Sequence, residues 1–310
     1  MASKLKLPLI SLFTIFGLVL LFHLSWQAGT PLTQGAVSEP PGGEYIGSEM
    51  CMTCHQDLEE NYQHTVHFRI AQNPRNELEG LGCESCHGPG SRHLEDQKNP
   101  YGLVNFGKKS KTSLALQNQA CLQCHQKSHS GWLGSIHEQK SLACAECHQV
   151  MEKVSDKFLL AKSSQSDLCG SCHRSQKAKT LKSYHMAIRD GKLECSSCHN
   201  PHGTPNDRQL LAHSVNETCF QCHADKRGPY LWQHPPVMEN CSNCHDPHGS
   251  SHAKMLVTQE TRLCQSCHVE TRHPTQPQDP AALFVFNRSC TNCHSQVHGS
   301  NHPSGVRFTR

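Results

Sequence analysis

Twenty cysteines and 25 histidines dominate the chemistry that this chain of 310 residues can support. The cysteines form ten C-x-x-C pairs, each followed directly by a histidine, so no cysteine is left over. In a helical turn, residues i, i+3 and i+4 lie on one face. Two thiols can therefore bond the two vinyl edges of one porphyrin while the histidine binds its iron, which is the attachment pattern of c-type haem.

Zinc and disulfide readings explain this pattern less well. Structural zinc needs four ligands from paired knuckles and has no use for a histidine after every second cysteine. Disulfides are common in exported chains but do not require this spacing. We therefore predict ten covalently attached haem c groups. The attachment cysteines are Cys51, Cys54, Cys83, Cys86, Cys121, Cys124, Cys144, Cys147, Cys169, Cys172, Cys195, Cys198, Cys219, Cys222, Cys241, Cys244, Cys264, Cys267, Cys290 and Cys293. The proximal iron ligands are His55, His87, His125, His148, His173, His199, His223, His245, His268 and His294.

The ten motifs come in twos, with first cysteines at 51/83, 121/144, 169/195, 219/241 and 264/290. One further histidine lies between the two motifs of each pair, and another follows the second motif of most pairs. In the second pair this trailing position holds Met151, in register with His202 and His248. The predicted distal ligands are His67, His93, His137, Met151, His185, His202, His234, His248, His273 and His298.

Five histidines of the exported part remain outside this scheme and are expected to be solvated or hydrogen-bonded: His64, His129, His213, His252 and His302. Three of them are alternatives to a predicted ligand. His64 lies close to His67, and His302 lies close to His298. His129 could ligate in place of Met151, because methionine also serves as a flexible gap filler near apolar surfaces.

The composition is too polar for an ordinary core. Only 35% of residues are hydrophobic and 6% are aromatic, whereas a typical domain is nearer half apolar. Haem faces must then supply the interior. We predict a mostly irregular fold with short α-helices and little or no β-sheet, wrapped around a linear haem chain. The formal charge of +3 comes from scattered basic residues, which gives no case for a nucleic-acid partner.

The N-terminus has the pattern of a secretory signal, because Lys4 and Lys6 precede an apolar run at 7–22. That run is short for a spanning helix of about 20 residues, although an uncleaved anchor is the alternative. We predict a signal peptide at 1–28, a linker at 29–50 and a decahaem domain of five motif pairs at 51–310. Within it, "YGLVNFGKKSK" (101–111) is expected to form a surface loop, and Trp132, Tyr184 and Trp232 to pack against haem edges.

Three stretches carry a resemblance to a known family: "LGCESCHGPGSRH" (81–93), "VNETCFQCHADKRGPYLWQHPPVMENCSNCHDPHGS" (215–250) and "SCTNCHSQVHGSNHPSG" (289–305). Over nearly all of the mature chain, the sequence resembles the decahaem c-type cytochromes of the MtrA and DmsE group. This implies bis-histidine haems in a staggered line, inside a periplasmic protein associated with the outer membrane. The implied partners are an outer-membrane β-barrel, an outer-surface multihaem cytochrome or reductase, and a periplasmic or inner-membrane cytochrome donor. At Met151 the family pattern has histidine.

Haem iron with two protein ligands has no vacant position for a substrate, so it transfers single electrons. We therefore expect an electron-transfer protein and not an enzyme. The alternative is a periplasmic multihaem reductase of the nitrite or hydroxylamine type, which needs one open haem and often marks it with an altered motif. A haem-storage or structural role is a third reading. All ten motifs keep their histidine, which favours electron transfer.

Overall fold

The computed structural model describes residues 40–182, 186–206, 208–269 and 289–309. The predicted signal peptide and much of the predicted linker lie outside these residues, as do Tyr184, His185 and His273. Within the described ranges, no helix is both long and apolar enough to cross a membrane.

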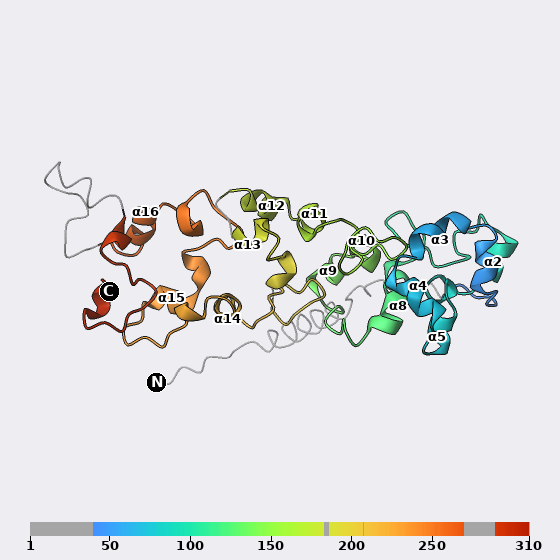
Figure 1. Ribbon diagram of the computed structural model, residues 1–310, viewed down its shortest axis with the longest axis horizontal. Helices are drawn as coiled ribbons and strands as arrows, with labels where there is room; N and C mark the ends of the chain where they lie inside the picture. Colours follow the sequence, from blue (N-terminus) through green and yellow to red (C-terminus); the bar gives the residue numbers. More distant parts are fainter. Residues whose placement is uncertain (1–39, 183–185, 207, 270–288, 310) are drawn as a thin grey trace, which may run out of the picture. The chain divides into compact units, whose positions relative to one another are not determined.

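Short helices joined by irregular segments make up the described chain (Figure 1). The α-helices are α2 (Ser48–Met52), α3 (Gln56–Tyr62), α4 (Val66–Gln72), α5 (Glu77–Gly80), α6 (Glu84–His87), α7 (Ser91–Glu95), α8 (Leu114–His125), α9 (Ile136–Gln139), α10 (Cys144–Cys147), α11 (Gln165–Gly170), α12 (Arg174–Thr180), α13 (Met186–Arg189), α14 (Val215–Phe220), α15 (Pro235–Glu239) and α16 (Glu260–Gln265). The 3-10 helices are η1 (Cys195–Ser197), η2 (Ala224–Lys226), η3 (Cys241–Asn243), η4 (Ala253–Met255), η6 (Cys290–Asn292) and η7 (Gly305–Arg307). Only isolated β-bridges occur among the described residues, which confirms the predicted fold class.

Each pair of motifs forms one structural unit, and we number these modules 1 to 5 in chain order. In modules 2, 3 and 4 the first motif lies on or just after a helix with a serine cap. Ser113, Ser164 and Ser214 each accept a hydrogen bond from a backbone N–H in the first turn. Such a cap satisfies an N–H group that has no partner inside the helix. The helix start is therefore fixed a few residues before the first cysteine.

One polar contact joins the two motifs of every module. A side chain three or four residues before the first cysteine accepts a hydrogen bond from a backbone N–H at the start of the second motif. The contacts are Ser48 from Cys83 (3.0 Å), Asn118 from Cys144 (2.9 Å), Gln165 from Ser196 (2.9 Å), Asn216 from Cys241 (2.7 Å) and Glu260 from Thr291 (2.9 Å). The second motif thus lies against the segment that carries the first.

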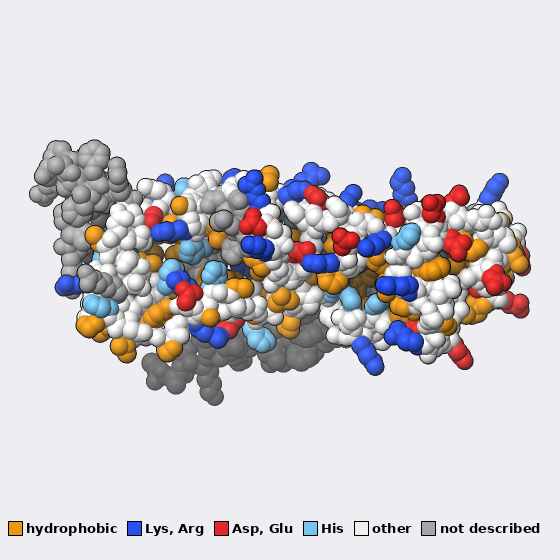
Figure 2. Space-filling model, viewed as in Figure 1, with side chains coloured by type: hydrophobic (Ala, Val, Ile, Leu, Met, Phe, Trp, Pro, Cys, Tyr) orange, Lys and Arg blue, Asp and Glu red, His pale blue; other side chains and the backbone are white. Residues whose placement is uncertain are grey.

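The described chain has very few buried apolar side chains. They are Val104, Leu116, Trp132, Ala143, Leu160 and Leu256. A cavity of about 4200 Å³ lies among modules 1 to 4, bounded by residues between Ile46 and Val257. Ordinary ligand pockets measure roughly 300–1,000 Å³. Figure 2 shows histidine side chains recessed in hollows of one face, while lysine and arginine side chains stand singly on the outside.

The segment 101–111 is irregular, but the prediction that it is a surface loop is only partly right. Val104 is 4% exposed. Its backbone N–H donates to the carbonyl oxygen of His87 at 2.8 Å, and its own carbonyl oxygen lies 2.8 Å from His87 Nδ1. Further along, Lys108 Nζ lies 2.8 Å from a carboxylate oxygen of Glu146. The segment therefore connects the second motif of module 1 with that of module 2.

The contact inside module 2 can be tested with Asn118→Ala. Asn118 is buried, and its amide also donates to the carbonyl oxygen of Leu142 at 3.2 Å. The substitution leaves the Cys144 N–H and the Leu142 carbonyl without this partner, so we expect the haem-loaded protein to lose about 1–3 kcal/mol of unfolding free energy. Denaturant unfolding measures the loss. Gln119→Ala, on the exposed side of the same helix, is the control, and an equal effect of both variants would contradict the prediction.

Candidate haem-binding sites

The first cysteines of the two motifs are neighbours in every module. In module 2, a hydrogen bond to Cys144 and burial raise the pKa of the Cys121 thiol. In module 4, burial and the neighbouring Cys241 raise the pKa of Cys219 to about 12. In the other three modules, burial and the neighbouring first cysteine likewise raise a thiol pKa. The affected thiols are Cys51 beside Cys83, Cys169 beside Cys195, and Cys264 beside Cys290. All twenty cysteines are described, and none of them forms a disulfide.

Successive modules meet at their second cysteines. Burial raises the pKa of Cys86, and the charge of Cys124 raises it further. Cys147 with Cys172, Cys198 with Cys222, and Cys244 with Cys267 repeat this arrangement at the next three junctions. First-to-first contacts within modules therefore alternate with second-to-second contacts between modules. The ten attachment motifs follow one another in space in the order in which they occur in the chain.

Seven pairs of histidine rings among the described residues face each other at one narrow spacing. An imidazole nitrogen lies about 2 Å from a first-row metal and about 1.1 Å from its own ring centre, so two imidazoles on opposite sides of one iron have centroids roughly 6.2 Å apart. The observed centroid distances are 6.0–6.3 Å. The pairs are His55–His93, His67–His125, His137–His173, His148–His202, His199–His248, His234–His268 and His245–His298.

The ring planes divide these pairs into two groups. Five pairs are close to parallel, with interplanar angles from 12° in His199–His248 to 24° in His234–His268. The other two are closer to perpendicular, at 71° for His67–His125 and 62° for His137–His173. Both of these contain the first-motif histidine of an internal module.

A simple order in the sequence governs which rings meet. The histidine between the motifs of one module faces the first-motif histidine of the next module, as in His67–His125, His137–His173 and His234–His268. The second-motif histidine of one module faces the trailing histidine of the next, as in His148–His202, His199–His248 and His245–His298. Adjacent modules therefore exchange imidazoles in both directions.

The first motif of module 1 has no preceding module, and it departs from this order. His55 faces His93, the trailing histidine of its own module, at 6.3 Å. At two other motifs the ring that the sequence predicts as distal lies outside the described residues, namely His185 and His273. No histidine in the described ranges faces His87 at the same spacing, and the ring that meets it edge-on at 5.3 Å is Phe106.

Backbone carbonyl groups orient the proximal imidazoles of all second motifs. The chain returns after each of these motifs and places a carbonyl oxygen against Nδ1 of its histidine. The partners are Val104 for His87 (2.8 Å), Phe158 for His148 (2.8 Å), Arg208 for His199 (2.9 Å), Lys254 for His245 (2.8 Å) and Arg307 for His294. A hydrogen bond at Nδ1 fixes the ring and leaves Nε2 for the metal. The sequence carries no side-chain signal for these partners, because main-chain oxygens make the contact.

Backbone carbonyl groups of the neighbouring module hold two of the imidazole rings that the sequence predicts as distal ligands. His137 Nδ1 lies 2.9 Å from the carbonyl oxygen of Pro201, and His234 Nδ1 lies 2.9 Å from that of Val297. Burial, together with nearby imidazoles of which His129 is the strongest, lowers the pKa of His202 to about 4. A neutral ring is the form that binds iron.

Geometry separates the alternatives that the sequence leaves open. His67, and not the exposed His64, faces His125. His298, and not His302, faces His245, while His302 Nδ1 accepts a hydrogen bond from the backbone N–H of Ser304 at 3.1 Å. The ring of His129 lies 4.0 Å from that of His202. It is therefore beside the His148–His202 pair.

The lining of the cavity fits c-type haem. Thiols and neutral imidazoles are the donors that covalent haem requires. Trp132 is 6% exposed, and its ring centroid lies 6.5 Å from that of His202. Its Nε1 is buried and has no hydrogen-bond partner among the described residues. Such orphaned groups are costly in a packed protein. A haem carries propionate oxygens that can accept from this N–H.

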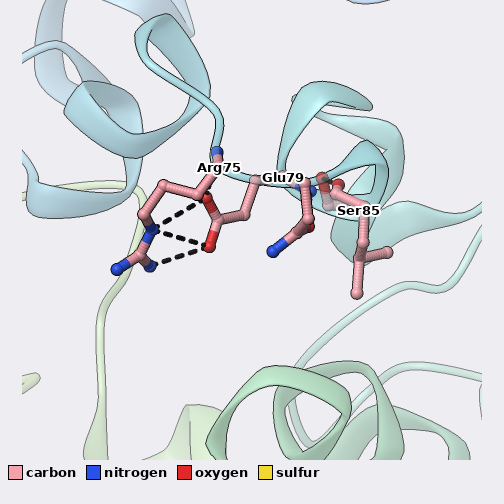
Figure 3. A network of polar contacts seen from close by, with 5 residues as sticks. Arg75, Glu79 and Ser85 are labelled. Atoms are coloured by element: carbon pink, nitrogen blue, oxygen red, sulfur yellow. Dashed lines mark hydrogen bonds and ion pairs between the residues drawn. The ribbon is translucent and has the colours of Figure 1, made fainter.

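A polar network supports the second motif of module 1 from outside (Figure 3). Arg75 pairs with Glu79 of α5 through its Nη2 at 2.7 Å. Ser85, inside the motif, donates to the carbonyl oxygen of Leu78 at 2.7 Å. Gln123 of α8 donates to the carbonyl oxygen of Ser85. These contacts attach the motif to the helices on both sides.

Comparisons with known proteins agree with this arrangement. Residues 185–228 and 234–273 match a family described as a doubled CXXCH motif, and residues 83–164 match the NrfB-like c-type cytochromes. The chain is similar to multiheme cytochrome MtrA of Shewanella baltica, with 44% identity over 85% of this chain and 81% of that protein. It is also similar to cytochrome c-type protein NrfB of Haemophilus influenzae, with 30% identity over 39% of this chain and 56% of that protein. Cytochrome c-554 of Nitrosomonas europaea is 32% identical over 27% of this chain and 38% of that protein.

The two groups of ring planes predict two classes of electron paramagnetic resonance signal in the oxidised protein. Parallel imidazoles split the iron d orbitals and give a rhombic low-spin spectrum, whereas perpendicular imidazoles leave two orbitals nearly degenerate and give a strongly anisotropic one. We expect His67→Ala to weaken the anisotropic class and to add a high-spin signal. His93→Ala, from a parallel pair, should weaken the rhombic class instead. Loss from the same class in both variants would contradict the prediction.

Proposed function

The chain belongs to the MtrA-type family of multihaem c-type cytochromes, and we propose that it conducts electrons along ten haem c groups between a periplasmic donor and an acceptor at or beyond the outer membrane. Electron transfer by covalently bound haem, without enzymatic turnover, follows from membership of the family. The count of ten haems and the route across the outer membrane are the proposed part. Ten C-x-x-C-H motifs support the count.

The observation that carries the proposal is the continuous order of attachment motifs combined with facing imidazoles at one spacing. When bound, haem c supplies one-electron exchange between ferric and ferrous iron. The cysteines hold each group in place, and the facing imidazoles would occupy both axial positions and keep other ligands away. We propose the seven observed pairs as axial ligand sets. The same sequence order assigns His185 to the haem of His223, and leaves His273 for the haem of His294.

The proposed location is the periplasm, in association with the outer membrane. The secretory pattern of the first 28 residues supports export. The family resemblance supports insertion into an outer-membrane β-barrel, contact with an outer-surface multihaem cytochrome or reductase, and a periplasmic or inner-membrane cytochrome as the donor. On the face drawn in Figure 2, acidic and basic side chains are interspersed, which does not favour a nucleic-acid partner.

The haem count can be measured on the intact chain. Because every motif keeps both cysteines and its histidine, we expect denatured mass spectrometry of the mature protein to show ten haem additions. The thioether bonds survive denaturation, so no haem should be lost during the measurement. Fewer than nine additions on fully matured protein would contradict the count.

Transfer across a membrane tests the conduit. Liposomes that hold the protein inside its β-barrel partner and enclose a reduced dye should pass electrons to an acceptor outside. Cys169→Ala/Cys172→Ala removes an attachment site in the middle of the line, so it should abolish most of the rate. His213→Ala changes an exposed histidine outside the proposed ligand sets and is the control.

Two outcomes would contradict the conduit. One is an undiminished rate in the variant that lacks a middle haem, because electrons would then bypass the line. The other is rapid turnover of nitrite or hydroxylamine by the purified protein alone, since that requires an iron with an open position.

A further inference from the structure

Met151 occupies the one distal position of the described chain that holds no histidine. It follows His148 by three residues, as His202 follows His199 and His248 follows His245. In modules 3, 4 and 5 the residue at this trailing position faces the second-motif histidine of the preceding module. The second-motif histidine that precedes module 2 is His87. No histidine ring among the described residues faces His87 at the spacing of the seven pairs, and the sequence order assigns His185 and His273 to other motifs.

We infer that Met151 is the second axial ligand of the haem held by Cys83, Cys86 and His87, and that this haem has the highest reduction potential of the set. The inference rests on the proposed axial pairs. A methionine–histidine pair raises the potential above that of a bis-histidine pair. The thioether is a neutral soft donor that iron accepts in c-type cytochromes.

The local structure connects the two residues. Met151 is half-buried and lines the same cavity as His87. The segment 101–111 contacts both sides of this region, through Val104 at His87 and through Lys108 at Glu146 of α10. Helix α10 ends at Cys147, four residues before Met151. The second motifs of modules 1 and 2 are therefore held together by one short segment of chain.

The main alternative ligand is engaged elsewhere. His129 lies 4.0 Å from His202 and 5.7 Å from His125 between ring centroids. Both of those rings already face another histidine at the spacing of an axial pair. His129 thus adjoins two complete pairs, His67–His125 and His148–His202, and neither of them contains His87.

A raised potential has a clear consequence at this position. The haem of His87 is second in the line of attachment motifs. An electron that reaches it stays longer than on a bis-histidine haem, so it is the first group reduced in an equilibrium titration. It would act as a brief electron store near one end of the line, whichever way electrons flow.

The inference can be tested on the mature, haem-loaded protein. Near-infrared magnetic circular dichroism separates methionine–histidine from bis-histidine haems by their charge-transfer energies, and a redox titration followed by the same signal gives the order of reduction. We expect one methionine–histidine haem, reduced first. Met151→His should convert it to a bis-histidine haem that titrates with the others. Met151→Leu should give one high-spin haem, which binds carbon monoxide when reduced.

Two matched controls locate the ligand and the iron. Met50→Leu changes another methionine that lines the cavity and should leave the methionine–histidine signal intact. Cys83→Ala/Cys86→Ala, verified by mass spectrometry to hold one haem fewer, should lose that signal, whereas Cys290→Ala/Cys293→Ala should keep it.

Three outcomes would overturn the inference. A purely bis-histidine spectrum in the unmodified protein excludes a methionine ligand. Loss of the signal in Met50→Leu assigns it to another methionine. Persistence of the signal in Cys83→Ala/Cys86→Ala assigns Met151 to another iron. In each case the unmodified protein would still transfer electrons across the liposome membrane, so these failures differ from a failure of the proposed conduit.

Discussion

The rest of the structure depends on the facing of two imidazoles that come from successive modules. Within one motif, the cysteines and the proximal histidine lie on a single turn, so local structure alone places them on one face. The ring on the other side comes from an adjacent module, either the preceding or the following one, in six of the seven pairs. In the proposed pairs, iron between two such rings would join modules that share few buried apolar side chains. Metal ligation would then contribute directly to folding, which would offset the low apolar content of the chain.

The peptide has two further tasks around these rings, which are to orient them and to keep them neutral. Main-chain carbonyl groups hold Nδ1 of each second-motif histidine. In three modules an isolated β-bridge also fixes the segment that returns to the motif, and these bridges are His148–Leu160, His199–Leu210 and His245–Leu256. Burial keeps the pKa of rings such as His202 and His248 below its ordinary value. An imidazole that is neutral and fixed in direction would need little structural rearrangement when haem iron gains or loses an electron. Such a ligand suits a site that only transfers electrons.

Repetition gives the modules similar environments, so differences between them have to come from small changes. Ring planes differ, from 12° in His199–His248 to 71° in His67–His125. Ligand identity is the stronger lever on potential, and among the five trailing positions the residue type changes at Met151 alone. Module 1 also differs in its ring pairing, because His55 faces a ring of its own module. The end of the line that contains module 1 thus differs from its middle in ring pairing, and we infer that it also differs in ligand chemistry.

The sequence by itself predicted the attachment sites, the set of distal candidates and the fold class, and the structure confirms the fold class. C-x-x-C-H is local, so one helical turn is enough to predict it, and the low apolar content already excluded an ordinary core. The tertiary structure decided which ring faces which, for example His67 and not His64 opposite His125, and His298 and not His302 opposite His245. It also brought Val104 to His87, although the sequence of this segment indicated a surface loop. These choices join residues from different modules, and many are made through main-chain oxygens. A pattern of side chains along the chain carries no information about contacts of that kind.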